Sequence, residues 1–191
     1  LHNVWIGTEG GGITKYNPQT NKFQWYKHSS NPNSLSHNNV KTIYYDHPNK
    51  ILWIGTHMGG LNKLDLRSNK FTRYHTNSDK GSLPSNIIRE IVPYKDNLLL
   101  ATHKGVCQFN PKTEKAVLLF QDSPISGTVS VHVDYQGTLW ISGNGEGVYA
   151  YRDDTKKTEN YKHNHALEHS ISSNHIGRIY EDSQKRLWFC T

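Results

Sequence analysis

Short runs of alternating apolar and polar residues follow one another along the chain, and no segment shows a sustained helical period. The runs span roughly four to seven residues and are rich in β-branched and aromatic side chains, which is the pattern of β-strands. Turns rich in Gly, Asn, Asp and Pro separate them. The pattern therefore predicts an all-β protein.

The runs recur in groups of four. In each group the first run alternates, the second carries a Trp or Leu, the third follows a glycine and the fourth ends in an aromatic or apolar residue. Four strands in a period of roughly 40–48 residues are typical of a β-propeller blade. The second run shows the repeat most clearly, as VWIGT, LWIGT, LLLAT, LWISG and LWFCT.

We predict a β-propeller segment of four-stranded antiparallel blades, about four blades in all and not a complete closed ring. Because the pattern opens at VWIGT and stops at LWFCT, both ends duplicate the same run, and we expect a longer protein. Unsealed strand edges are prone to pair with another chain. The predicted boundaries are 1–39 (last three strands of a blade and a crossing loop), 40–87, 88–128 and 129–175 (complete blades), and 176–191 (first two strands of a blade).

Composition adds that the chain is polar and basic. Hydrophobic residues make up 34% of the 191 residues, and the net charge is +6. No run of about 18 apolar residues occurs, so no membrane-spanning helix is predicted. A nucleic-acid groove needs a continuous basic stripe with interleaved aromatic residues. Here much of the excess positive charge is distributed one Lys per blade at the same turn, so we expect no nucleic acid to bind this segment. These residues are Lys22, Lys70, Lys115 and Lys157.

Cysteine and histidine give little support for special chemistry. Cys107 and Cys190 lie in strand-like runs and are interpreted as buried thiols rather than a disulfide or a nucleophile. His163 and His165, with His169 nearby, form the best candidate metal site, but no cysteine or repeated carboxylate accompanies them. Because catalytic motifs such as GxSxG and HExxH are missing from the sequence, we expect no cofactor, no metal and no catalysis by this segment.

The repeats resemble those of the two-component regulator propeller family. LWIGTHMGGLNKLD (52–65) and VWIGTEGGGITKYN (4–17) are similar to the family's LWIGT-x-x-GG pattern, and SLSHNNVKTIYYD and SISSNHIGRIYED to its lead-in. The resemblance implies the sensor region of a hybrid two-component histidine kinase, in the periplasmic portion of an inner-membrane protein. It also implies that the ligand is an oligosaccharide and that the kinase lies outside these residues.

Comparison among the repeats separates residues that serve every blade from those particular to one. The recurring glycine is attributed to a positive φ or a close approach, the recurring Asn to turn or capping bonds, and the recurring Trp to packing between blades rather than sugar stacking. They are Gly12, Gly60, Gly105 and Gly147; Asn38, Asn86 and Asn174; and Trp5, Trp53, Trp140 and Trp188.

Side chains that differ between blades are the candidate ligand contacts. In a propeller, the loop between the second and third strands and the crossing loop open on the same face. Polar side chains there suit a polyhydroxylated ligand, although an ordinary solvated loop is the favoured explanation of any single one. The candidates are Glu9, His37, Asn39, His57, Met58, His103, Lys104, Asn144, Glu146 and His175.

Taken together, the patterns favour a ligand-sensing and signal-transmitting propeller segment of a membrane-bound two-component sensor that detects an oligosaccharide. The alternative is a protein–protein interaction scaffold, because fold does not set function. A propeller lyase or glycosidase is disfavoured, since Glu9 and Glu146 are the only carboxylates in the candidate set. We expect a homo-oligomer or strand-edge pairing, and contact with a membrane only through a part of the protein beyond this segment.

Overall fold

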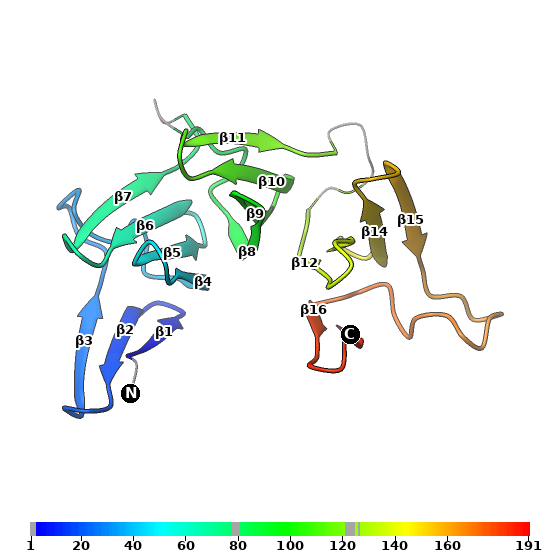
Figure 1. Ribbon diagram of the computed structural model, residues 1–191, viewed down its shortest axis with the longest axis horizontal. Coiled ribbons are helices and arrows are strands. Elements are labelled where there is room, and N and C mark those ends of the chain that lie inside the picture. Colours follow the sequence, from blue (N-terminus) through cyan, green and yellow to red (C-terminus); the bar gives the residue numbers. More distant parts are fainter. Residues whose placement is uncertain (1–2, 78–80, 121–124, 126) are drawn as a thin grey trace. The chain divides into compact units, whose positions relative to one another are not determined.

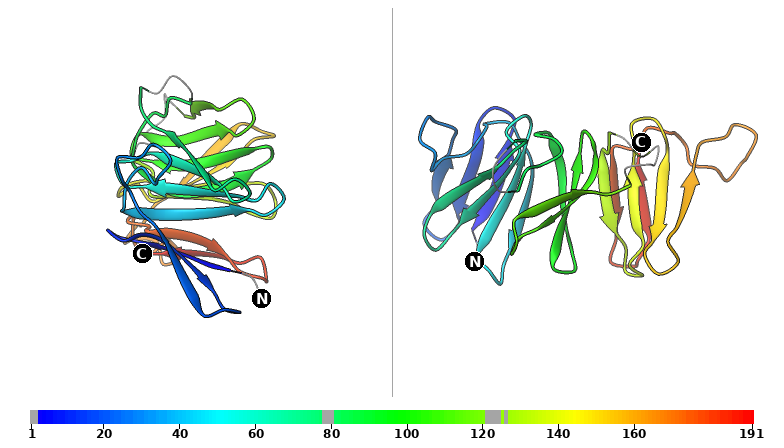
Figure 2. Two further views of the ribbon diagram at one scale, coloured as in Figure 1. Left: turned by 90° about the vertical axis from the view of Figure 1, so that its left-hand side faces the viewer. Right: turned by 90° about the horizontal axis from the view of Figure 1, so that it is seen from above.

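The computed structural model describes residues 3–77, 81–120, 125 and 127–191, in which strands are the regular elements. Figure 1 and Figure 2 show five sheets that follow one another along the chain. Every strand pair whose register is described is antiparallel. The predicted all-β propeller segment of four-stranded antiparallel blades is thereby confirmed. Among the described residues, no helix is long and apolar enough to span a membrane.

The chain divides into two compact units, Leu1–Ile91 and Val92–Thr191, and the division falls within a strand. Unit 1 contains one three-stranded and one four-stranded sheet, in which the strands lie in chain order. The three-stranded sheet comprises β1 (Val4–Thr8), β2 (Gly12–Asn17) and β3 (Lys22–Tyr26), and the four-stranded sheet comprises β4 (Val40–Asp46), β5 (Ile51–Thr56), β6 (Leu61–Asp65) and β7 (Lys70–Tyr74).

The next sheet begins at β8 (Ile88–Tyr94), the strand that contains the division. It is followed by a second four-stranded sheet and a two-stranded sheet, again in chain order. The strands are β9 (Asn97–Thr102), β10 (Gly105–Asn110) and β11 (Lys115–Leu118); then β12 (Ser130–Val133), β13 (Leu139–Ser142), β14 (Val148–Arg152) and β15 (Lys157–Tyr161); then β16 (Arg178–Glu181) and β17 (Leu187–Cys190).

Apolar side chains from neighbouring sheets pack into a core within each unit. In unit 1, Ile13 of β2 packs with Leu52 and Leu64 of the next sheet, and all three are fully buried. In unit 2, Leu99 of β9 packs with Val131 and Ile141. Because a buried Leu or Ile stabilises the fold by about 1.5–3 kcal/mol, these clusters hold adjacent sheets face to face.

β12 and β16, each the first strand of its sheet, end where an Asp starts the following turn. β12 ends at Val133, and Asp134 Oδ1 accepts the backbone N–H groups of Gln136 and Thr138. Its Oδ2 accepts the indole N–H of Trp140 at 2.8 Å. Asp182 forms the matching bonds at the end of β16. One carboxylate thus closes the hairpin and fixes the tryptophan.

Tryptophan and cysteine burial differs between repeats. Trp53 is fully buried, as packing between blades requires, whereas Trp188 is 51% exposed. Cys107 is buried, and desolvation raises the pKa of its thiol to about 12, which keeps it protonated and unreactive. Cys190 is exposed in β17, so the prediction that both thiols are buried is wrong for this residue. Only one face of that two-stranded sheet is covered, and the alternation of residues along the strand does not show which face is covered.

Candidate functional site

The loop between the second and third strands of each blade ends at a glycine with a positive φ. At Gly60 φ is +73°, and an added Cβ would clash with the carbonyl oxygen of Tyr74. The Thr56 hydroxyl donates to the Gly60 carbonyl at 2.9 Å, which closes the turn. The interpretation of these glycines as backbone requirements therefore holds. The other copies with positive φ are Gly12, Gly105 and Gly147.

A recurring Asn joins this turn to the crossing loop. The backbone carbonyl of Asn86 accepts the N–H of Gly60 at 2.9 Å, and its side-chain Oδ1 accepts the N–H of Thr76 at 2.8 Å. The carbonyl thus binds the loop and the amide binds the chain just after the fourth strand. The same pair of bonds is formed by Asn38 with Gly12 and His28, and by Asn174 with Gly147 and His163.

In unit 1 the structure brings Glu9 and Asn39 together. Glu9 Oε1 accepts hydrogen bonds from Lys41 Nζ at 2.8 Å and from Asn39 Nδ2 at 3.2 Å. The bond from Lys41, followed by that from Asn39, lowers the pKa of the Glu9 carboxyl. Asn39 also accepts the backbone N–H of His57 at 2.9 Å on its carbonyl oxygen. Three predicted candidates therefore lie in one hydrogen-bonded group.

His37 and Met58 lie beside this group. The Asn39 backbone N–H bonds His37 Nδ1 at 3.1 Å. Met58 has φ of +77° and its side chain is 64% exposed. A non-glycine residue in this conformation stores backbone strain, and such strain gathers at functional sites. Met58 thus presents an exposed apolar side chain one residue after His57, a member of the polar group.

The candidates of unit 2 form looser pairs. Gly127 lies near both the Asn144 side chain and the His103 carbonyl, while the His175 ring lies against Gly145. Glu146 Oε2 accepts from Lys162 Nζ at 2.7 Å. Lys104 is exposed, with its backbone N–H bonded to Thr102 Oγ1 at 3.1 Å. Each unit therefore holds its own candidates, whose ligand-binding role stays a prediction.

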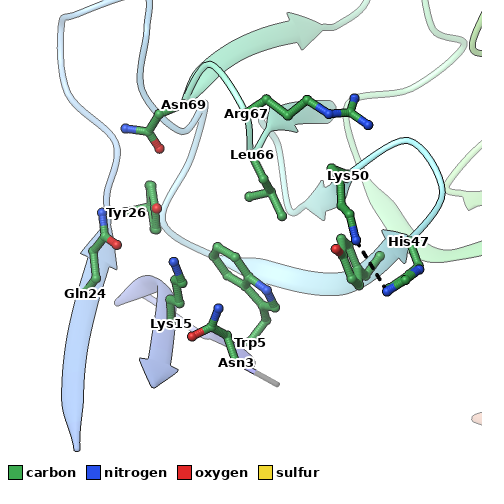
Figure 3. Close-up of a pocket in the computed structure, with 11 residues that line it drawn as sticks. Asn3, Trp5, Lys15, Gln24, Tyr26, His47, Lys50, Leu66, Arg67 and Asn69 are labelled. Atoms are coloured by element: carbon green, nitrogen blue, oxygen red, sulfur yellow. Dashed lines mark hydrogen bonds between the residues drawn. The ribbon is translucent and has the colours of Figure 1, made fainter. Parts of the chain in front are cut away.

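A hollow that the sequence did not indicate lies between the two sheets of unit 1 and is called the first groove. Its volume is about 790 Å³, within the range of ligand sites. Figure 3 shows Trp5 at the centre of the residues drawn, with Leu66 above it and Lys15 beside it. The described lining residues are Asn3, Trp5, Lys15, Gln24, Tyr26, Tyr45, His47, Lys50, Leu66, Arg67 and Asn69.

Half-buried apolar side chains form the floor of the first groove. Trp5 and Tyr26 lie with ring centroids 5.7 Å apart, and Leu66 belongs to the same packed cluster. Desolvation raises the pKa of the Tyr26 hydroxyl. Lys15 Nζ lies 5.6 Å from the centre of the Trp5 ring, a cation–π distance. The floor thus combines flat aromatic surface with a neighbouring cation.

Long polar side chains from two turns and from the neighbouring strands form the rim. Arg67 Nη1 donates to the carbonyl of Asn49 at 2.7 Å, which holds the β6–β7 turn against the β4–β5 turn. Lys50 Nζ lies 3.4 Å from His47 Nε2, the contact drawn as a dashed line in Figure 3. The rim therefore offers donors at fixed positions above an apolar floor.

Sequence reasoning missed the first groove because it sought ligand contacts at only two loops. The same comparison at the β6–β7 turn would have shown Leu66 and Arg67 where the matching turn after β14 has Asp153 and Asp154. That difference is a usable signal. The convergence of Trp5 with these turns is not visible without the register of the strands.

Comparisons with known proteins agree with the fold. A profile of the family described as "Two component regulator propeller" matches residues 34–58 and 170–191. No curated protein matches the chain in sequence.

The solved structures similar to the chain belong to proteins with different functions. One is the extracellular domain of the hybrid two component system BT3049 from B. thetaiotaomicron, with a TM-score of 0.72 and 20% identity, covering 99% of this chain and 30% of that one. Another is PorZ, a surface component of the type-IX secretion system of Porphyromonas gingivalis, with a TM-score of 0.67, 14% identity and coverage of 98% and 29%. Virginiamycin B lyase from Staphylococcus aureus follows, with a TM-score of 0.57, 19% identity and coverage of 80% and 48%. At these identities the likeness shows the fold, and the chain spans about a third of the first of these structures.

Proposed function

Because the chain carries two component regulator propeller repeats, we propose that it is a ligand-sensing segment of a membrane-bound two-component sensor. It lies in the periplasmic portion of an inner-membrane protein and detects an oligosaccharide. The propeller itself carries out no catalysis. The likeness to the extracellular domain from B. thetaiotaomicron supports this assignment.

The first groove is the observation that carries the proposal. A sugar ring offers one apolar face and a rim of hydroxyl groups, so its binding site needs a flat aromatic surface with donors and acceptors around it. Trp5 and Tyr26 supply the flat surface, and Gln24 and Asn69 supply amide groups at the edge. The volume of about 790 Å³ is large enough for more than one sugar ring.

A ligand in this groove is well placed to produce a signal. The lining residues come from both sheets of unit 1, so a bound ligand contacts both blades at once. A ligand that binds one arrangement of the blades more tightly shifts the population toward it. Transmitting that shift to a kinase requires rigid movement of one packed element against another. The cluster at Glu9 and Asn39, on the loop face, is a second proposed contact surface.

The test is binding of a panel of oligosaccharides by calorimetry, using the full extracytoplasmic region that carries this chain. We expect Trp5→Ala to weaken binding about tenfold or more, which corresponds to ~1.4 kcal/mol. Trp25→Ala is the matched control, because Trp25 lies in the same sheet, is 66% exposed and does not line the first groove. Thermal melting must show that both variants stay folded. Failure of every saccharide to bind, or equal losses for both variants, would overturn the proposal.

Exposed aromatic side chains on β3 favour a protein-interaction scaffold as the second candidate. Phe23 is 54% and Trp25 is 66% exposed, and Val4 and Ile6 of β1 are also exposed. Such residues suit a protein contact, including pairing with a second copy of the chain. Light scattering of the wild type and of Trp25→Ser distinguishes this role: an oligomer that dissociates only in the variant supports it.

An enzymatic role gains nothing from the structure. Each candidate carboxylate is paired with a lysine, Glu9 with Lys41 and Glu146 with Lys162. Acid–base catalysis of glycoside cleavage needs two carboxylates together, and the candidate set has one in each unit.

A further inference from the structure

The first groove carries an excess of positive charge. Lys15, Lys50 and Arg67 contribute ammonium and guanidinium groups, and none of its described lining residues is acidic. Two carboxylates lie close by in the chain, but both are used within their own turns. Asp46 accepts from the backbone and the side chain of Asn49. Asp65 accepts the backbone N–H groups of Arg67 and the next residue, which lowers its pKa.

Unit 2 contains a second groove that shares two equivalent turns with the first, those after β12 and β14, and its charge is balanced. Its volume is about 410 Å³, and Lys95 and Arg152 line it together with Asp153 and Asp154. Lys95 Nζ lies 3.0 Å from Asp153 Oδ2, so this cation has an ion-pair partner inside the groove. The two Asp residues occupy the repeat positions of Leu66 and Arg67.

The repeat therefore acts as an internal control. The same turn supplies two negative charges in the second groove but an apolar and a positive side chain in the first. The first groove is also nearly twice as large and has an aromatic floor. Cations gathered on a surface whose lining contains no acidic residue favour an anion from solution.

We infer that the first groove binds an acidic saccharide, whose carboxylate or sulfate group lies between Lys15, Lys50 and Arg67. The sugar ring stacks on Trp5. This inference rests on the proposed function and adds the charge of the ligand to it. Arg67 is suited to a bidentate contact with either anion, while Lys15 and Lys50 act as point charges.

The experiment compares acidic and neutral oligosaccharides of equal length on the full extracytoplasmic region. The probes are trigalacturonate and a sulfated chondroitin disaccharide, with maltotriose and cellobiose as neutral counterparts. We expect an acidic probe to bind at least about tenfold more tightly than its neutral counterpart. Raising the salt from about 0.05 to about 0.3 M shortens the screening length and should weaken only the acidic probe.

The decisive variant transplants one turn residue of the second groove. Arg67→Asp introduces the side chain that Asp154 supplies at the equivalent position and leaves the packing of Leu66 unchanged, so the fold should survive. We expect this variant to lose the preference for acidic probes. The control is Lys157→Asp, which also changes the net charge but alters an exposed residue at the start of β15 that lines neither groove.

The outcomes separate the two claims. Neutral probes that bind as tightly as acidic ones, with loss on Trp5→Ala, would leave the saccharide sensor standing and overturn the anionic ligand. Equal loss of acidic binding in the transplant and in Lys157→Asp would also overturn it, because a general charge effect then suffices. If no probe binds, both the proposed function and the inference of an acidic ligand are overturned.

Discussion

Gly60 and Gly10 share a left-handed backbone but differ in their surroundings. At Gly60 φ is +73°, and an added Cβ would clash with the carbonyl oxygen of Tyr74. At Gly10 φ is +92°, and an added Cβ would have no neighbouring atom within 4 Å. We expect Gly60→Ala to reduce the free energy of unfolding by about 2–4 kcal/mol, because the backbone strain of a positive φ and the steric clash with Tyr74 both destabilise the folded state. Gly10→Ala should cost about 1 kcal/mol, from the backbone conformation alone. Urea denaturation measures both. Equal losses would show that the close approach to Tyr74 does not matter.

At the scale of elements, the crossing loop is held by Asn86, which binds two segments at once. Its side chain accepts from the Thr76 backbone and donates to the Thr76 hydroxyl at 3.1 Å, while its carbonyl holds Gly60. We expect Asn86→Ala to destabilise the protein by about 1–3 kcal/mol, since partly buried partners lose their bonds. Hydrogen exchange should accelerate at the Thr76 amide. The His163 amide, held by Asn174, is the internal control. Unchanged exchange at Thr76 would show that water replaces the side chain without cost.

At the scale of the whole molecule, the features that the sequence could predict are those that recur at the same position in each repeat. Asn86 and Gly60 recur at fixed places in the repeat, so the sequence alone indicated a structural role that the hydrogen bonds now explain. The first groove has no such signature. Trp5 was interpreted as packing, and it does pack, but one side of its ring also faces the groove. Arg67 lines the same groove as Trp5 but is distant from it in the sequence. Only the strand register brings the two residues onto one surface.

Carboxylates in both units also give the whole molecule a common response to acid. Hydrogen bonds and nearby cations lower the pKa of several of these groups in the folded chain. For Asp153 the bonds from Lys156 and then Lys95 lower it to about 2. As the pH falls, the unfolded chain takes up protons first, so stability is present above about pH 4.5 and is lost toward the folded pKa values. The groups with lowered pKa include Glu9, Asp65, Asp153, Glu159 and Asp182.

We therefore expect the urea midpoint to fall steadily between about pH 4.5 and pH 2, and to fall less at high salt because these groups are exposed and screened. Asp153→Asn should lower stability at pH 6 and flatten the part of the decline between about pH 4 and pH 2. The control is Asp96→Asn, since Asp96 Oδ2 lies 3.8 Å from Lys112 with both side chains largely exposed. An unchanged fall of the urea midpoint in Asp153→Asn would show that the contacts of Asp153 with Lys95 and Lys156 contribute nothing to stability in solution. A flatter fall in this variant alone would assign part of the acid response to those contacts.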